Sequence, residues 1–307
     1  MKISPSPEIS IGVAAHGNVL NTQRCLEAIF SSLSGNFELI LVDDSSPDHI
    51  EHLAVFQRAA TKHKNTKIFY FPKQLEYTGS LDCILSEARG RLVFFISNDI
   101  YVTPSFFKLL MARANSNPRA GIIRGVSNFV DNGKSSHQVK LAPGDYGLKQ
   151  IAEIGDVLEE ASGGEVIYDD YLTGDAFCIT RAALDQVGGI DPLFYGYFGD
   201  VDLGIRVARC GFNLEVCLGA FAFHNAGSNF SYLRDEEKSK KVNARFYKVH
   251  ENWARFKLKY DFPVSLKFDG LNGLDWGALN RDEISTLSSN FIKSSSYAQY
   301  QVLIAPA

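Results

Sequence analysis

The sequence predicts an α/β fold in which helices flank a doubly wound, mostly parallel sheet. In the first hundred residues, short apolar runs alternate with segments whose apolar residues recur every three or four positions. This alternation is typical of parallel strands joined by crossover helices. Three of the predicted strands end in short polar stretches, "AAHGN", "DDSSPD" and "SNDIYV". Because ligands of such sheets bind beyond the carboxyl ends of the strands, we expect a functional site there.

The N-terminal half contains four predicted strands, each followed by a predicted helix. The strands are expected at residues 9–14, 37–42, 66–71 and 92–96. The helices are expected after the cap residues Asn21 and Thr22, after Ser46 and Pro47, over residues 79–89, and after Thr103 and Pro104. The second strand is apolar enough to be buried on both faces.

The C-terminal half is less regular. Strands are expected at residues 121–126, 172–180 and 214–223, and helices at 181–187, 200–210 and 233–260. Residues 131–167 are rich in glycine, serine, lysine and acidic residues, which predicts a long loop or insertion with a little helix. Loops of that length are usually functional or mobile.

Composition and charge indicate a soluble globular protein. The 307 residues, 45% hydrophobic and 21% charged, are enough for one large domain or two modest ones. The net charge of −4 gives no reason to expect nucleic acid as a partner. Five scattered cysteines without a CxxC pair predict reduced thiols. We expect a cytoplasmic protein, because "MKISPSPEIS" lacks the apolar core of a signal peptide and no apolar run approaches the ~20 residues of a bilayer span.

The sequence contains no glycine-rich loop of the kinds that bind nucleotide phosphates. Neither GxGxxG after the first predicted strand nor GxxxxGK[ST] is present. A nucleotide would therefore need carboxylates, backbone groups and a metal. Asp43 and Asp44 end the second predicted strand, where they either accept hydrogen bonds from a base or ribose or cap the next helix together with Ser46.

Two residues are candidate metal ligands. Asp99 follows the fourth predicted strand, and one carboxylate can suffice for a hard divalent cation that keeps several waters. The alternative is a turn-forming aspartate. His224 follows an apolar strand and suits a neutral imidazole ligand, although a lone histidine is more often structural.

Two acids open the helix expected at residues 200–210. Asp200 and Asp202 lie two positions apart and therefore point in different directions. One of them can cap the helix or favour its dipole while the other faces a cleft as a candidate general base. Both can also be caps.

Taken together, these segments resemble the family 2 glycosyltransferases, in particular rhamnosyltransferase-like bacterial members. The resemblance runs from about residue 9 to residue 229. It rests on "ISIGVAAHGN", "FELILVDDSSPD", "FFISNDIYVTPSFFKLL", "LTGDAFCITRAALDQVGGIDPLFYGYFGDVDLGIRVARCGF" and "AFAFHNAGSNF", which stand in the family's order and spacing. It implies a GT-A fold with a Rossmann-like, mostly parallel sheet, and an inverting enzyme that uses nucleotide sugars.

The resemblance also implies site residues. The nucleotide-sugar-binding residues would be Ala14, Ala15, His16, Asp43, Asp44, Asn98 and Asp99. The acceptor-side residues would be Gly174, Asp175 and Asp202, with Asp200 as the base that deprotonates the acceptor hydroxyl. Asp99, the last acid of the family's DxD motif, and His224 would hold Mn²⁺ or Mg²⁺ on the diphosphate.

The sequence departs from the family at two positions. Ser97 stands where the first acid of DxD is expected, which predicts weaker and more donor-dependent metal binding. Gly199 replaces the glutamate usual before Asp200, which is expected to alter how the acceptor is held. These departures leave open a rival function, a non-catalytic nucleotide-sugar-binding protein that kept the fold. A sugar nucleotidyltransferase would need a basic, glycine-rich loop, and "AAHGNVLNTQR" offers only Arg24.

The resemblance divides the chain and suggests its partners. Residues 1–232 would form the glycosyltransferase domain, with 1–104 as the nucleotide-sugar-binding half and 105–232 as the acceptor half. Residues 233–307 would form a C-terminal helical extension whose aromatics pack on the catalytic domain or a second subunit, or lie on the inner face of an anionic membrane. The donor would be a UDP- or dTDP-sugar and the acceptor a glycan or lipid-linked glycan. A homo-oligomer is also left open.

Overall fold

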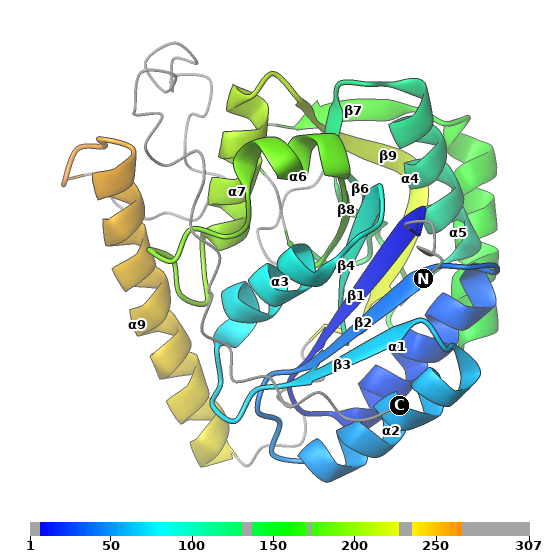
Figure 1. The fold of residues 1–307 in the computed structure, drawn as a ribbon, viewed down its shortest axis with the longest axis horizontal. Helices are drawn as coiled ribbons and strands as arrows, with labels where there is room; N and C mark the ends of the chain where they lie inside the picture. The colour runs from blue at the N-terminus through cyan, green and yellow to red at the C-terminus, as the bar shows by residue number, and fades with distance from the viewer. Residues whose placement is uncertain (1–6, 131–136, 170, 172–173, 227–234, 266–307) are drawn as a thin grey trace, which may run out of the picture.

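The computed structural model describes residues 7–130, 137–169, 171, 174–226 and 235–265. Within these residues the strands form one nine-stranded sheet in the order β3-β2-β1-β4-β8-β6-β9-β5, with β7 paired to β9 (Figure 1). The strands are β1 (Ile9–Ala15), β2 (Glu38–Asp43), β3 (Thr66–Tyr70), β4 (Leu92–Ser97), β5 (Ile100–Val102), β6 (Ala120–Ser127), β7 (Val166–Asp169), β8 (Ala176–Thr180) and β9 (Asn213–His224). The helices are α1 (Val19–Ser32), α2 (His49–Lys62), α3 (Glu76–Glu87), α4 (Pro104–Ser116), α5 (Leu148–Ser162), α6 (Arg181–Val187), α7 (Gly199–Arg209) and α9 (Asp235–Lys259).

The direction of the strands confirms the predicted α/β class. The first four strands of the order are parallel to one another, and β6 and β9 share their direction. β8 runs antiparallel between β4 and β6, while β5 and β7 run antiparallel to β9. The sheet is therefore mostly parallel, and its antiparallel strands all lie beyond β4 in the strand order.

Helices cover both faces of the sheet, because its central strands are apolar on both sides. On β4, Leu92, Phe94 and Ile96 face the core under α1, α2, α4 and α5. The alternate residues Val93 and Phe95 face the core under α3, α6 and α7. The period of two along a strand thus builds a three-layer molecule.

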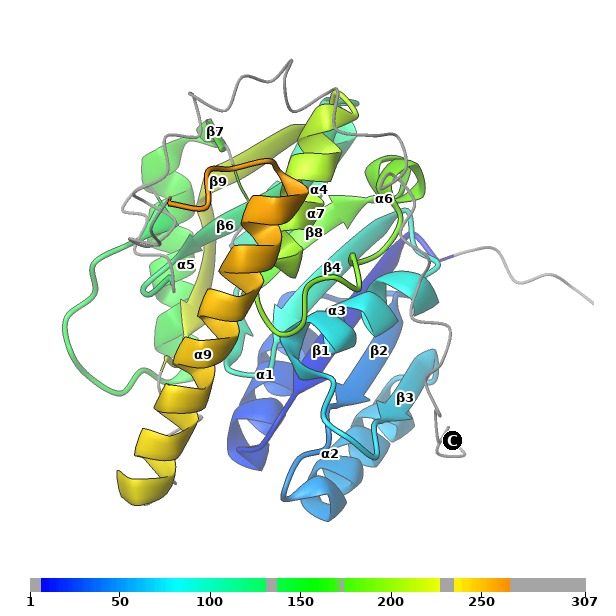
Figure 2. The ribbon, with the colours of Figure 1, turned by 90° about the vertical axis from the view of Figure 1, so that its left-hand side faces the viewer.

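The helix α9 adds a third core at the edge of this sandwich. Trp253, Phe256 and Tyr260 are buried against Phe198 and other apolar residues at the start of α7. Figure 2 shows α9 running along the outside of the molecule beside α7. The expected packing of the tail's aromatics on the catalytic domain is thus present in this half of the helix. The predicted domain boundary at 232 and 233 lies outside the described residues.

Several predicted element boundaries were wrong. Helix α1 begins at Val19 with Asn18 as its cap, so Asn21 lies inside the first turn. Helix α2 begins at His49, and the Ser46 hydroxyl instead accepts a hydrogen bond from Gly17 N at 2.9 Å. The expected loop at 131–167 contains the fifteen-residue helix α5 and the start of β7. The strand expected at 172–180 begins only at Ala176, and residues 172 and 173 lie outside the described part.

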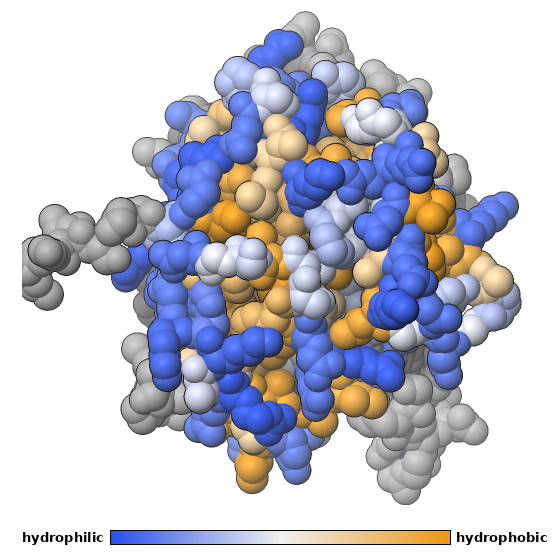
Figure 3. Space-filling view, turned by 90° about the vertical axis from the view of Figure 1, so that its right-hand side faces the viewer, coloured by the Kyte–Doolittle hydropathy of each residue, from blue (hydrophilic) through white to orange (hydrophobic). Residues whose placement is uncertain are grey.

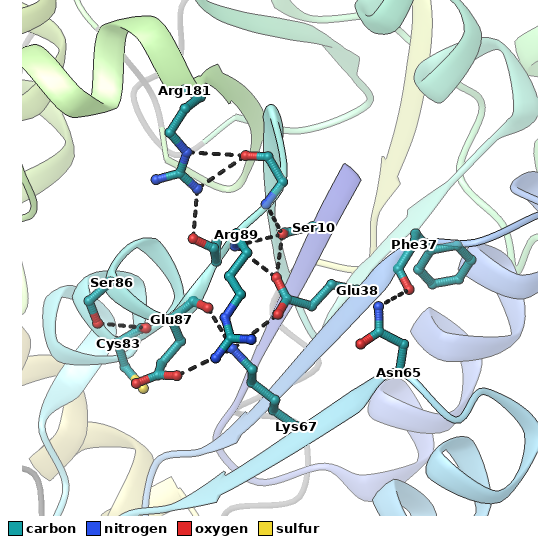
Figure 4. Close-up of polar contacts among 12 residues, drawn as sticks. Ser10, Phe37, Glu38, Asn65, Lys67, Cys83, Ser86, Glu87, Arg89 and Arg181 are labelled. Atoms are coloured by element: carbon teal, nitrogen blue, oxygen red, sulfur yellow. Dashed lines mark hydrogen bonds and ion pairs between the residues drawn. The ribbon is translucent and has the colours of Figure 1, made fainter. Parts of the chain in front are cut away.

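The amino-terminal end of the sheet is closed by a polar network. Glu38, at the start of β2, is 2% exposed and accepts hydrogen bonds from Ser10 Oγ at 2.5 Å and from Arg89 N at 2.8 Å (Figure 4). Lys67 Nζ lies 3.0 Å from its other oxygen. On the outer side of the molecule that α4 and α5 cover, hydrophilic and hydrophobic side chains are interspersed (Figure 3). All five cysteines carry free thiols, in line with the sequence.

Candidate active site

The turns that follow β1 and β2 are bound to each other. Asp44 N donates to the Ala15 carbonyl at 2.9 Å, and His16 Nδ1 contacts the Asp44 carbonyl at 2.8 Å. Asp43 Oδ1 accepts from Ser46 N at 2.9 Å, which shapes the turn without capping α2. The register of β1 and β2 sets Ala15 opposite Asp43. The predicted nucleotide-sugar-binding residues on these two strands therefore meet at one edge of the sheet.

Asn98 ties the turn after β4 to the same place. Its N–H donates to the Ala14 carbonyl at 3.0 Å, and its side-chain amide donates to Gly17 O at 3.1 Å and to Thr22 Oγ1 at 2.9 Å. Ala14 also lies opposite Ser97 in the sheet register. The Asn98 side chain is buried at 3% exposure. These contacts hold the loop after β1 in position.

Asp44 has an unusual pKa for an aspartate. Its Oδ1 accepts a hydrogen bond from Leu75 N at 2.6 Å, which connects it to the start of α3. The pKa of its carboxyl group is raised from 3.8 to about 7. Burial and the charges of Glu76 and Asp43 raise this pKa, and the backbone hydrogen bonds of Leu75 and Glu76 only partly oppose them. The carboxyl group therefore changes charge near neutral pH.

Asp99 and His224 come together from positions far apart in the sequence. The antiparallel pairing of β5 with β9 sets Ile100 opposite His224, so Asp99 precedes the strand beside the imidazole. The distance from His224 Nε2 to Asp99 Oδ2 is 3.5 Å. Cis ligands of an octahedral ion with bonds of about 2.1 Å lie about 3 Å apart. A carboxylate and an imidazole at this spacing fit a Mn²⁺ or Mg²⁺ ion.

Asp175 lies on the opposite side of the same imidazole. Asp175 Oδ2 is 3.9 Å from His224 Nδ1, and Asp175 Oδ1 is 3.1 Å from Arg124 Nη2. Because Asp99 and Asp175 face different ring nitrogens, they cannot bind one ion together with His224. In the part of the chain that the structure describes, no group of three or more histidine, cysteine or acidic side chains could hold a metal ion.

Asp200 lies in the first turn of α7, beside Gly174. Backbone N–H groups of Val201, Asp200 and Gly174 donate to its carboxylate, and Tyr77 Oη donates to the Gly174 carbonyl at 2.8 Å. A Cβ atom at Gly174 would stand 2.7 Å from Asp200 Oδ2 and 1.7 Å from Tyr77 Oη. Only glycine allows this close approach.

The environment of Asp200 changes its acidity. The pKa of the carboxyl group is raised from 3.8 to about 6. Burial raises this pKa most, the three backbone donors partly oppose it, and the charge of Asp175 adds to the rise. A carboxylate with a pKa just below the working pH is mostly ionised and still basic. This is the condition for an effective general base.

Asp202 does not lie beside the other predicted acceptor-side residues. It is fully buried, and its carboxylate contacts Arg206 Nε at 2.8 Å, Tyr260 Oη at 2.6 Å and Lys259 Nζ. Arg206 and Lys259 hold the pKa of its carboxyl group below the usual range, although burial opposes them. The contacts of Asp202 therefore join α7 to α9.

Gly199 has no space for the glutamate that the family usually carries there. A Cβ atom at this position would stand 2.7 Å from Thr78 Cγ2 and 2.9 Å from Ile190 Cγ2. The side chains of α3 and of the segment before α7 fill the volume instead. The departure from the family pattern is thus built into the packing.

Arg124 and Tyr77 were not predicted as site residues from the sequence. Both come from elements without a recognised motif, and both reach the site only because β6 and α3 lie next to β8 in the fold. A buried arginine within an otherwise apolar strand was the one available signal for Arg124, since such a charge needs a partner.

A nine-stranded α/β sheet with polar residues gathered beyond its strands is the architecture of a GT-A glycosyltransferase. Residues 10–174, more than half of the chain, match the profile of glycosyl transferase family 2, and the chain belongs to this family. The family that the sequence predicted is therefore confirmed.

Relatives of known name agree with this assignment over shorter stretches. The chain is 31% identical over 101 residues to N-acetylglucosaminyl-diphospho-decaprenol L-rhamnosyltransferase of Mycobacterium tuberculosis, a match that covers 31% of this chain and 32% of that protein. It is 24% identical over 134 residues to EpsH of Bacillus subtilis, which is provisionally named a glycosyltransferase, with coverage of 42% and 37%. The chain thus spans about a third of the length of the curated relatives it matches.

Solved structures share the fold at low sequence identity. The mannosyltransferase PcManGT of Pyrobaculum calidifontis, in complex with GDP-Man and Mn²⁺, has a TM-score of 0.52 at 14% identity and covers 74% of this chain and 60% of its own. GalNAc-T7 with UDP, GalNAc and Mn²⁺ has a TM-score of 0.54 at 13% identity, with coverage of 72% and 44%. Across the described ranges, none of the helices combines the length and apolar character that crossing a bilayer requires.

Proposed function

We propose that this glycosyltransferase is an inverting enzyme that moves a hexose-type sugar from a UDP- or dTDP-sugar to a hydroxyl group of a glycan or lipid-linked glycan. One observation carries the proposal. Two adjacent residues before β8 contact a candidate base and a candidate metal ligand: Gly174 N donates to Asp200, and Asp175 lies 3.9 Å from His224 Nδ1. The base and the metal ligand that a single displacement would use are therefore close to each other.

The proposed chemistry assigns one task to each side of the donor sugar. Asp200 removes the proton from the acceptor hydroxyl as that oxygen attacks the anomeric carbon, which contributes typically ~10²- to 10⁴-fold in rate. Asp99 and His224 would hold Mn²⁺ or Mg²⁺ on the diphosphate, where such a cation absorbs the charge that develops on the leaving group. The Mn²⁺ in the structures of PcManGT and GalNAc-T7 supports a divalent cation here as well.

The nucleotide is proposed to bind over the turns after β1 and β2. The backbone at Ala14, Ala15 and His16 would line the base, with Asp44 accepting hydrogen bonds from base and ribose. Asp43 and Asn98 have their side chains engaged by Ser46 N, Gly17 O and Thr22, so we propose that they shape the pocket without touching the nucleotide.

Asp200→Asn tests the reaction. We expect a loss of ~10²-fold or more in transfer to acceptor, with nucleotide binding retained, because amide and carboxylate have similar shapes. Sugar transfer is measured by the release of nucleoside diphosphate and nucleotide binding by calorimetry. Asp185→Asn is the matched control, since the Asp185 side chain is 63% exposed on α6, and it should transfer at the wild-type rate. Equal turnover by Asp200→Asn would remove Asp200 as the base.

The rival function predicts a different result in the same assay. A non-catalytic nucleotide-sugar-binding protein would bind UDP with Mn²⁺ but transfer sugar to no acceptor. A thermal-shift panel of nucleotides and nucleotide sugars would identify the donor first. A ligand that binds only the folded state adds about 2.7 kcal/mol of stability at a hundredfold excess over its Kd.

A lipid-linked acceptor would bring the enzyme to a membrane, and the lipid-linked acceptor in the name of the mycobacterial relative supports this class. We propose that the exposed part of α9 binds anionic lipid from the cytoplasmic side. Phe246 and Tyr247 are 59% and 73% exposed there, and α9 carries eight lysines and arginines against four acids.

Vesicle sedimentation tests this contact. Replacing Phe246 and Tyr247 by serine should weaken binding to anionic vesicles, whereas Leu258→Ser, at a residue 78% exposed near the other end of α9, should not. Equal binding by all three proteins would contradict the proposed surface. Self-association stays a prediction, which sedimentation of the protein alone can check.

A further inference from the structure

The neighbour of Ser97 in the sheet is an acid. The antiparallel register of β4 and β8 sets Ile96 opposite Ala176, and the next pair is joined by a hydrogen bond from Ser97 N to the Asp175 carbonyl at 3.0 Å. The sequence thus lacks a carboxylate at the end of β4, two residues before Asp99, but has one beside that position, directly before β8. Asp175 is not a direct substitute, because it faces the other side of the imidazole from Asp99.

Asp175 is held in one orientation by buried donors. Its Oδ1 accepts from Ala176 N at 3.0 Å and lies 3.1 Å from Arg124 Nη2. Arg124 is itself only 3% exposed and donates through Nε to the Gly125 carbonyl at 3.1 Å. Because one carboxylate oxygen is fixed on β6 and β8, the other oxygen is directed toward His224.

The surroundings of His224 favour a proton on Nδ1. Nδ1 lies 3.3 Å from the Phe129 carbonyl, which can only accept, and 3.9 Å from Asp175 Oδ2. Asn128 fixes the backbone of the same residue, since its Oδ1 accepts from His224 N at 2.7 Å and its Nδ2 donates to His224 O at 3.0 Å. With the proton on Nδ1, the lone pair of Nε2 points toward Asp99.

We propose that Asp175, fixed by Arg124, is a positioning residue that sets the tautomer and orientation of His224 for binding the divalent cation. The inference rests on the proposed metal site at Asp99 and His224. A carboxylate behind a metal-binding histidine commonly plays this part, and its removal typically lowers metal affinity 10- to 100-fold. Ser97 removes one charged ligand of the family's metal site. On this proposal the protein does not replace that ligand, and Asp175 instead holds the nitrogen ligand His224 in place.

The competing explanation is that Asp175 only neutralises Arg124, since a buried arginine needs a partner. The two explanations are separated by a variant that removes both charges. In Arg124→Met/Asp175→Asn the two charges of this ion pair are removed together, and the net charge near the site is unchanged. A purely neutralising Asp175 predicts wild-type metal affinity in this double variant, whereas a positioning Asp175 predicts weaker binding.

The experiment is a Mn²⁺ titration in saturating UDP, followed by the electron paramagnetic resonance signal of free Mn²⁺. We expect the Kd for Mn²⁺ to rise ~10- to 100-fold in Asp175→Asn and in the double variant. In a His224→Asn background, Asp175→Asn should cause no further loss, because the residue acts through the imidazole. Glu215→Gln is the matched control. Glu215 is a buried carboxylate on β9, the strand that ends at His224, and it pairs with Arg113 at 2.5 Å. Its replacement should leave the Kd for Mn²⁺ unchanged.

Each outcome decides the proposal. Wild-type Mn²⁺ affinity in the double variant overturns the positioning role and leaves the proposed function intact. A loss from Asp175→Asn that persists in the His224→Asn background also overturns it, because the carboxylate would then act by its charge alone. Wild-type protein that binds UDP but no Mn²⁺ removes the metal from the proposed function, and the inference with it.

Discussion

Gly174 and Asp175 contact opposite parts of the candidate site. Gly174 N donates to the Asp200 carboxylate, while the Asp175 carboxylate lies beside His224. The backbone at Gly174 is packed so closely that a Cβ atom would stand 1.7 Å from Tyr77 Oη. At this scale, the distance between the candidate base and the candidate metal ligand depends on the absence of one side chain.

Gly174→Ala is expected to reduce transfer because it pushes Tyr77 and Asp200 away from residue 174. We expect kcat to fall by at least tenfold, since displacements of about 1 Å in a site can cost 10²-fold. Gly144→Ala is the matched control, because a Cβ atom there meets nothing within 4 Å. Steady-state kinetics of both variants checks the prediction, which fails if the two retain the same kcat.

Asp44 is expected to make nucleoside binding pH-dependent. Its pKa of about 7 means that the carboxylate, which on the proposed function accepts hydrogen bonds from base and ribose, is replaced by the neutral acid as the pH falls through 7. The affinity for uridine should therefore rise between pH 6 and pH 8. Uridine is preferred to UDP, because a phosphate group titrates near pH 6 itself. Saturation-transfer NMR measures this, and the same pH dependence in Asp44→Asn would contradict the assignment.

The sequence was enough to single out the acids of the candidate site, but it did not show which way all of their side chains point. Asp99, Asp200 and His224 were recognisable because each ends or begins an element. Asp175 was assigned to the acceptor side with Asp202, yet it faces His224, and Asp202 is buried in ion pairs. Which partner an acid meets depends on strand order. Asp175 contacts His224 only because β8 and β9, which come from different parts of the chain, lie on either side of β6.

At the scale of elements, α7 begins in an unusual conformation that α9 supports. Phe198, the residue before α7, has a φ of 68°, in the left-handed region that costs a non-glycine residue ~1–3 kcal/mol. Its ring packs against Trp253 at 5.9 Å and Phe256 at 5.3 Å between centroids. The burial of these rings offsets the backbone cost and fixes the turn from which Asp200 projects.

Phe256→Ala is expected to destabilise the protein and disturb α7. Removing this fully buried ring should lower the free energy of unfolding by ~3–5 kcal/mol. It should also reduce kcat at temperatures at which the variant is still folded. Phe246→Ala on the same helix is the control, because that ring is 59% exposed and surface changes usually stay within about 0.5 kcal/mol. Urea unfolding compares the two, and equal losses would mean that α9 does not support the site.

The elements themselves were predictable where the apolar pattern was strong. The strands β1 to β4 were expected within two residues of their ends, because each contains a run of apolar residues, whereas the three-residue strand β5 was not predicted. Helix α5 was not located within the predicted loop, and its length was underestimated, since only Ile151 and Gly155 of its fifteen residues are buried and its polar residues resemble a loop. Asn21 was taken for a cap, but its buried side chain accepts from Tyr101 Oη at 2.9 Å instead.

At the scale of the molecule, the Glu38 network closes the end of the sheet opposite the site. Burial disfavours the charged form of Glu38, yet hydrogen bonds from Ser10, Arg89 N and Lys67 outweigh it and lower the pKa. A lowered pKa in the folded state means stability that is present above the ordinary value of 4.5 and is lost as the pH falls through the folded pKa.

Glu38→Gln should therefore destabilise the protein at neutral pH and less so in acid. We expect a loss of about 1–3 kcal/mol at pH 7, because the amide cannot satisfy the three donors. The difference in Tm from wild type should shrink below pH 4.5. Glu87→Gln, whose side chain contacts the same Lys67 but is 41% exposed, should show a smaller effect. A difference that is constant from pH 7 to pH 3 would exclude the charge of Glu38 as its cause.

The pH dependence of the single-turnover transfer rate tests the central claim, that Asp200 is the base, most directly. Because burial raises the pKa of Asp200 to about 6, the carboxylate is ionised above that pH and neutral below it. With donor and acceptor saturating, the wild-type rate should rise about tenfold per pH unit below 6 and level off above it. Asp200→Asn should be slower by ~10²-fold or more and lack this rise. If Asp200→Asn shows the same rise of the rate with pH and transfers at nearly the wild-type rate, Asp200 is not the base.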